Sequence, residues 1–144
     1  MKIIPLAQPD AGEAFVAPLY AHRVPAGFPS PADDYLDKGL DLNEYLIKHP
    51  VATFYCRVEG HSMEGIGIFD RDILIVDRAL EPLHGDVVLA VLNGELTCKV
   101  LDIQRQRLLS ANDDFKPMPI QEGADFVVEG VVTSSIRRHR CLPS

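Results

Sequence analysis

Residues 86–101 read DVVLAVLNGELTCKVL, two runs of strand-forming residues on either side of an Asn-Gly pair. Asn93 and Gly94 both tolerate positive φ, and this dipeptide is the strongest short-range signal of a two-residue β-hairpin. We therefore expect residues 86–92 and 95–101 to form adjacent antiparallel strands. This hairpin makes a mostly β fold the expectation for the rest of the chain.

Four further segments around the hairpin carry the same strand signal. Each is rich in β-branched and aliphatic residues. They are TFYCRV at 53–58, DILIVD at 72–77, RLLSAN at 107–112 and FVVEGVV at 126–132. With 144 residues and an apolar fraction of 47%, the chain can form one domain with a buried core.

Two short helices are predicted in front of these strands. Ser30 can cap the first helix, which Gly39 interrupts. Asp41 can cap the second, with Glu44 as its capping-box partner and Pro50 as its stop. The apolar residues of this second helix follow an i, i+3, i+4 spacing, which predicts a stripe that faces a core; they are Leu42, Tyr45 and Leu46.

The first 25 residues are rich in Pro, Ala and Gly without a sustained period, which predicts an irregular arm. This arm is too short to hold a helix-turn-helix domain. Its start, MKIIPLAQPDAGE, has no apolar run that would suit a signal peptide, and no segment approaches the roughly 20 apolar residues of a membrane span. We therefore expect a cytoplasmic protein without a membrane segment.

The charge balance argues against direct nucleic-acid binding. Fourteen basic and twenty-one acidic residues give a formal net charge of -7, which repels a phosphate backbone. The basic run RRHRC at 137–141 is expected to be a solvated tail. We therefore expect no sequence-specific contact between the body of the protein and DNA.

The cysteines point to neither a disulfide framework nor a zinc site. Cys56, Cys98 and Cys141 are an odd number at wide spacings and form no CxxC pair. The first two lie in apolar strand-like runs, where a small buried thiol is the usual role. We expect all three to be free thiols, and none to be the preferred nucleophile.

The segment GHSMEG at 60–65 places a serine in a loop that can turn sharply. Ser62 lies between glycines that allow its hydroxyl to be exposed, although a serine in such a loop is most often a turn residue. His61 is its neighbour, but adjacent side chains of an extended segment point to opposite faces, so we expect His61 to be exposed and not to reach the hydroxyl. No Ser-His-Asp set follows from the spacing of the histidines.

Lys99 is the candidate base for this serine. It lies within ELTCKVL, where burial would lower its pKa and leave a neutral amine able to deprotonate a hydroxyl. The alternative is an edge-strand lysine that faces water, a device that natural sheets use against aggregation. Strand alternation puts Lys99 with Thr97 and Glu95 on the more polar face, and it leaves both alternatives open.

Several segments together resemble the UmuD family, the self-cleaving subunits of error-prone DNA polymerase V. They are GHSM, DILIVD, LHGDVVLAVLNGELTCKVL, AGFPSPADDY and LNEYLIKHP. The likeness runs from about Ala26 nearly to the end of the chain, and the wider family includes the LexA and phage repressor cleavage domains. It implies a LexA-like peptidase fold of twisted antiparallel strands with one or two short N-terminal helices. It also implies a cleavable extended arm at 1–26 and a peptidase and dimerisation domain at 27–144.

The resemblance also implies a serine-lysine site that needs no metal and no cofactor. Ser62 matches the nucleophile, Lys99 the general base and Ala26-Gly27 the scissile bond, with backbone N–H groups of His61 and Ser62 as the oxyanion donors. Ala26 and Gly27 are small enough for a tight cleft, and the prolines around them favour the extended backbone that a protease binds.

The function implied is that of an SOS-response mutagenesis protein. Its expected partners are a second copy of the chain, a RecA filament on single-stranded DNA that stimulates cleavage, a Y-family DNA polymerase catalytic subunit and the replicative sliding clamp. The alternative is a dimeric binding module that regulates a polymerase without self-cleavage. The chain departs from the family at His61, where an acidic residue is typical, and at Arg71, where a glycine often stands.

Overall fold

The computed structural model describes residues 1–9, 12–20 and 36–140. These residues fall into two compact units, one of Met1–Pro9 with His49–Ser144 and the other of Asp10–Lys48. The expected boundary after residue 26 lies outside the described residues and stays a prediction.

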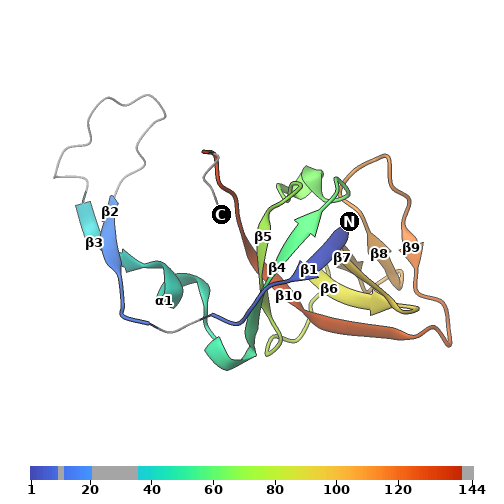
Figure 1. Ribbon diagram of the computed structural model, residues 1–144. Helices are drawn as coiled ribbons and strands as arrows, with labels where there is room; N and C mark the ends of the chain where they lie inside the picture. Colours follow the sequence, from blue (N-terminus) through green and yellow to red (C-terminus); the bar gives the residue numbers. More distant parts are fainter. Residues whose placement is uncertain (10–11, 21–35, 141–144) are drawn as a thin grey trace. The chain divides into compact units, whose positions relative to one another are not determined.

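The larger unit is one antiparallel sheet with only short helical turns, and this confirms the mostly β expectation (Figure 1). The turns are two short 3-10 segments, Pro50–Ala52 and Glu64–Ile66. From one edge to the other the strands are β1 (Lys2–Pro5), β4 (Thr53–Glu59), β5 (Ile73–Asp77), β10 (Phe126–Ile136), β6 (Val87–Leu92), β7 (Glu95–Asp102), β8 (Arg107–Leu109) and β9 (Met118–Pro119).

The hairpin that the sequence predicts is confirmed. Strands β6 and β7 pair antiparallel, with Leu92 opposite Glu95, so the connection has two residues. Asn93 and Gly94 take φ values of 49° and 82°, as a turn with two left-handed residues requires.

The last strand, β10, joins the two halves of the sheet. It pairs with β5 on one side and with β6 on the other, with a register shift along each ladder. Gly130 lies at one of these shifts, where a Cβ atom would come within 2.6 Å of the Val76 side chain, so no larger residue fits without movement. Predicted at 126–132, this strand in fact runs on to Ile136.

The sheet curls, so strands that are distant in its order come together. Strands β1 and β7 contact each other although four strands separate them in the sheet. One hydrophobic cluster accordingly contains Ile3 of β1, Val58 of β4, Leu74 of β5 and Cys98 of β7. This curl also brings the loop after β4 close to β7.

The smaller unit pairs β2 (Val16–Tyr20) with β3 (Leu36–Asp41), and α1 (Leu42–Leu46) follows. The predicted N-cap is confirmed, because the Asp41 carboxylate accepts a hydrogen bond of 3.0 Å from the Asn43 N–H. The predicted core-facing stripe is wrong, since the side chains of Leu42 and Tyr45 are each 60% exposed. The helix ends at Leu46, before Pro50, because Ile47 takes an extended backbone.

Three other expectations differ from the structure. The first predicted helix, between Ser30 and Gly39, is wrong over its described part, because strand β3 begins at Leu36; Ser30 lies outside the described residues. The prediction of an irregular arm is wrong at β1 and β2, because β1 pairs with β4 and β2 pairs with β3. Strand β8 is shorter than the predicted 107–112, because residues 110–112 leave the sheet to contact the loop at 60–65, and β9 was not predicted.

Candidate active site

Lys99 is buried in the interior of the sheet. Its strand, β7, runs between β6 and β8, and Lys99 pairs with the buried residue Val88. With 5% of Lys99 exposed, the edge-strand alternative is wrong. Burial lowers the pKa of the Lys99 ammonium, and the charges of Cys98 and Glu95 oppose this shift only in part.

Ser62 lies in the loop that follows β4. Gly60 turns the chain at a φ of 116°, and Ser62 is fully buried beyond it. The Lys99 Nζ atom donates a hydrogen bond of 3.1 Å to the Ser62 Oγ atom and lies 3.3 Å from the Cys98 carbonyl oxygen. A hydroxyl and a buried amine with a lowered pKa are therefore within direct proton-transfer distance.

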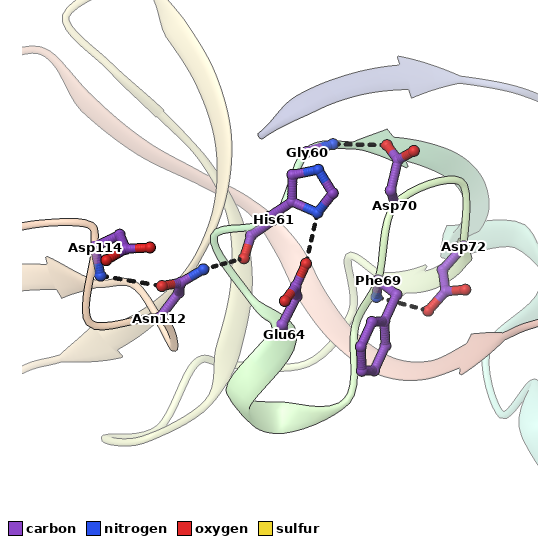
Figure 2. Close-up of polar contacts among 8 residues, drawn as sticks. All are labelled: Gly60, His61, Glu64, Phe69, Asp70, Asp72, Asn112 and Asp114. Carbon is purple, nitrogen blue, oxygen red and sulfur yellow. Dashed lines mark hydrogen bonds and ion pairs between the residues drawn. The ribbon is translucent and has the colours of Figure 1, made fainter.

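The Ser62 loop, residues 60–66, is held by a segment about fifty residues further along the chain. The Ala111 N–H donates to the Ser62 carbonyl at 2.8 Å, and the Gly65 N–H donates to the Ala111 carbonyl at 2.6 Å. The Asn112 amide donates to the His61 carbonyl at 2.9 Å and accepts from the Asp114 N–H at 3.0 Å (Figure 2). Sequence reasoning missed Asn112, for which the only signal was a turn-forming residue at the end of a strand.

His61 is exposed, as the alternation of side chains predicted. Its ring is 66% exposed and its Nδ1 atom lies 2.5 Å from a Glu64 carboxylate oxygen (Figure 2). His49 and His84 contact Asp77 and Asp102 instead. The structure thus pairs Ser62 with a lysine.

An ion pair between the buried Asp72 and the exposed Arg137 holds the chain just beyond the Ser62 loop. Asp72 is 2% exposed and accepts hydrogen bonds of 2.9 and 2.8 Å from Arg137 and one of 2.9 Å from the Phe69 N–H, the last drawn in Figure 2. Burial by itself raises the pKa of Asp72, but these hydrogen bonds outweigh it and hold the pKa below its usual range. Arg137 also donates to the Gly67 carbonyl at 2.6 Å and stacks over the Phe69 ring. The expectation that the basic run is only solvated is therefore wrong for Arg137.

The second departure from the family, Arg71, lies at a position where the backbone conformation favours glycine. Its φ is 74°, in the left-handed region that favours glycine, and its N–H donates to the Val58 carbonyl at 2.7 Å. Glycine would reach this turn without steric cost, whereas arginine reaches it with some strain.

The two cysteines of the described residues are buried free thiols, as expected. Cys56 and Cys98 are free and fully buried, and burial raises the pKa of their thiols to about 11 and about 12. Cys141, Ala26 and Gly27 lie outside the described residues. Within the described ranges, no cluster of His, Cys, Asp and Glu could hold a metal ion, and no helix is long and apolar enough to cross a membrane.

Comparisons with known proteins find one family along most of the chain. Residues 18–133 match the Peptidase S24-like family. Protein ImpA of Escherichia coli is 43% identical over 136 residues, which cover 94% of each chain, and protein MucA of Escherichia coli is 40% identical over 141 residues, which cover 96% of this chain and 97% of MucA. The LexA repressor of Xylella fastidiosa (strain M12) is 36% identical over 120 residues, 82% of this chain and 56% of that repressor.

Proposed function

The chain belongs to the Peptidase S24-like family, as a UmuD-like mutagenesis protein of this self-cleaving, LexA-related group, and from this premise we propose that Ser62 and Lys99 cut its own Ala26-Gly27 bond. The observation that carries the proposal is the 3.1 Å hydrogen bond between Lys99 Nζ and Ser62 Oγ, made by a lysine that is only 5% exposed.

In the first step, neutral Lys99 takes the Ser62 proton while Ser62 Oγ attacks the Ala26 carbonyl carbon. Backbone N–H groups at His61 and Ser62 stabilise the oxyanion that forms. The Lys99 ammonium then gives its proton to the Gly27 nitrogen, and the peptide bond breaks.

In the second step, water attacks the ester between Ala26 and Ser62. Lys99 removes a proton from this water, and Ser62 regains its proton when the ester bond breaks. The products are a fragment of residues 1–26 and a trimmed protein of residues 27–144. Because substrate and catalyst share one chain, a high effective concentration compensates for a modestly activated serine.

We propose that the trimmed protein acts as a dimeric accessory subunit of a Y-family DNA polymerase, with the sliding clamp as a further partner. A RecA filament on single-stranded DNA would stimulate the cut by favouring the arrangement in which the 26–27 bond enters the site. The likeness to ImpA and MucA along nearly the whole chain supports this role. The net charge of -7 supports recruitment through proteins rather than through direct DNA contact.

The test is intact mass spectrometry of the purified protein between neutral and alkaline pH, with and without RecA, single-stranded DNA and nucleotide. We expect loss of residues 1–26 at a rate that rises with pH as Lys99 becomes neutral. Ser62→Ala and Lys99→Ala should abolish it.

Lys116→Ala is the matched control for the lysine variant, because Lys116 is exposed in the same unit. It should cleave at the original rate. An original chain that stays uncut with every stimulus would instead favour a binding module that acts without self-cleavage.

A further inference from the structure

Strand β1 is an edge strand of the sheet, yet it precedes the 18–133 range that matches the family. It pairs antiparallel with β4, and the pairing continues past its end through hydrogen bonds of 2.9 and 2.8 Å that link Leu6 and Ala7 to Tyr55. Ile3 is its one buried side chain, at 9% exposed, and it packs in the main core cluster. Strand β1 thus covers the outer edge of β4 with little buried surface of its own.

The residues of β1 are suited to ending the sheet. Lys2 places a charge on the edge, and Pro5 has no N–H to offer a further strand. Strand β4 reads TFYCRVE, so it has no proline and is rich in residues with high β propensity. Without β1, the edge of β4 would be open to another extended segment.

The surface around this pairing contains an arginine with a buried nitrogen that makes no hydrogen bond within the described residues. Arg57 lies opposite Ile4, and its buried Nε atom has no hydrogen-bond partner within the described part of the chain. Arg71 lines the same cleft, together with Ile4 and Arg57. A buried guanidinium nitrogen without an acceptor favours a ligand that brings one.

Two acidic residues, Glu59 and Asp70, also line this cleft. Glu59 lies opposite Lys2 in the β1–β4 register, two positions from Arg57, and the Asp70 carboxylate accepts a hydrogen bond of 2.8 Å from the Gly60 N–H (Figure 2). A carboxylate in the place of Ile4 would lie directly opposite Arg57 on the same face of the two strands.

We propose that the outer edge of β4 is a docking groove for an extended acidic segment of a partner protein. The segment pairs with β4 as β1 does, with an aliphatic residue in the place of Ile3 and a carboxylate in the place of Ile4. Strand β1 fills this groove in the intact chain. The opening of the groove rests on the proposed self-cleavage, which would make β1 part of a separate peptide that a short ladder with one buried side chain holds weakly.

The test uses the full chain with Ser62→Ala, in which the recognition sequence of a site-specific protease replaces residues 24–30. The arm is then cut independently of the chain's own activity, so failure of self-cleavage would not affect the result. The probes are fluorescent peptides of sequence MKIIPLAQ and its Ile4→Glu, Ile4→Lys and Ile3→Asp variants, measured by anisotropy. A second route opens the edge without any cut, by an Ile3→Asp substitution in the chain itself.

We expect the Ile4→Glu peptide to bind the cut chain about tenfold more tightly than the original peptide, as a charge-assisted hydrogen bond would allow. The Ile4→Lys peptide should bind more weakly than the original, and the Ile3→Asp peptide should not bind measurably. Arg57→Met in the protein should remove the advantage of glutamate while leaving binding of the original peptide unchanged.

Three results would overturn the proposal. The first is no binding of any peptide at millimolar concentration, either to the cut chain or to the Ile3→Asp chain. The second is equal affinity for the Ile4→Glu and Ile4→Lys peptides. The third is a glutamate advantage that survives Arg57→Met.

Discussion

The two sides of the candidate active site are built differently. Lys99 is held by packing inside a continuous strand ladder, where its position follows from the register of β6 and β7. Ser62 is held in a loop by hydrogen bonds from Ala111 and Asn112, on a segment that has left the sheet. The position of Lys99 should therefore tolerate nearby polar changes, whereas the position of Ser62 should depend on a few contacts that single substitutions can remove.

The largest effect on self-cleavage is expected at Lys99, the candidate base. Lys99→Met keeps the shape of the side chain but removes the amine, and we expect self-cleavage to fall by at least about 10³-fold. The same variant should be more stable to unfolding at neutral pH by about 1 kcal/mol, because it no longer buries an ammonium group. Cleavage is read by intact mass and stability by urea unfolding.

The pH dependence of stability gives a second readout for Lys99. Its folded-state pKa is below the usual 10.5, so the original chain is penalised below that folded pKa and gains stability as pH rises toward 10.5. Lys99→Met should lack this gain, and Lys116→Met should retain it. A Lys99→Met chain that cleaves within tenfold of the original rate would rule out Lys99 as the base.

The second-largest effect on the cleavage rate is expected in the Ser62 loop, at Gly65. A Cβ atom there would lie 2.4 Å from the Ala111 carbonyl oxygen, so Gly65→Ala must move the loop away from its support. We expect a cleavage rate about 10²-fold lower, as for other small displacements of a catalytic group. Gly12→Ala is the matched control, because a Cβ atom at Gly12 meets nothing within 4 Å. Equal rates for the two variants would show that the loop does not need this contact.

A smaller effect is expected when the hydrogen bond from Asn112 to the Ser62 loop is removed. Asn112→Asp keeps the oxygen that accepts from the Asp114 N–H but loses the donor to the His61 carbonyl. We expect a cleavage rate about tenfold lower, with the midpoint of thermal unfolding nearly unchanged. Asp113→Asn alters an exposed neighbour and should have no effect. An unchanged rate for Asn112→Asp would mean that the backbone contacts of Ala111 suffice.

The smallest effect on rate is expected beyond the loop, at the Asp72–Arg137 ion pair. Arg137→Met should lower the midpoint of thermal unfolding by roughly 5 °C, whereas Arg138→Met, on an exposed neighbour, should not. Because the folded-state pKa of Asp72 is lowered, the stability from this pair is present above the usual 3.8 and is lost as pH falls through that lowered pKa. A difference in stability that persisted unchanged in acid would contradict this assignment.

Local sequence signals predicted β7, the strand of Lys99, but they did not predict the contacts that hold the Ser62 loop. Asn93 and Gly94 encode their hairpin within two residues, so the place of β7 followed directly. The contact of Asn112 joins residues 51 apart in the sequence, and only the completed fold brings them together. No pattern within either segment carries that information.

The alternation of side chains along β7 could not predict the burial of Lys99, for a different reason. Both faces of β7 are covered, with Cys98 in one hydrophobic cluster and Leu101 in another. A strand buried on both faces loses the period-two signal that separates inside from outside. For α1 the error was the opposite one, because the predicted core-facing stripe is exposed. A helix of about one turn has too little surface to determine its own burial.

The position of β10 has a consequence for the newly made chain. The loop of Ser62 connects β4 to β5, and Lys99 lies in the β6–β7 hairpin, so the two groups are on halves whose strands β10 connects in the order of the sheet. Because synthesis proceeds from the N-terminus, residues 126–136 leave the ribosome after both groups. A growing chain thus carries Ser62 and Lys99 before β10 can pair with the strands of both halves, and we expect the proposed cut of the arm to wait for that pairing.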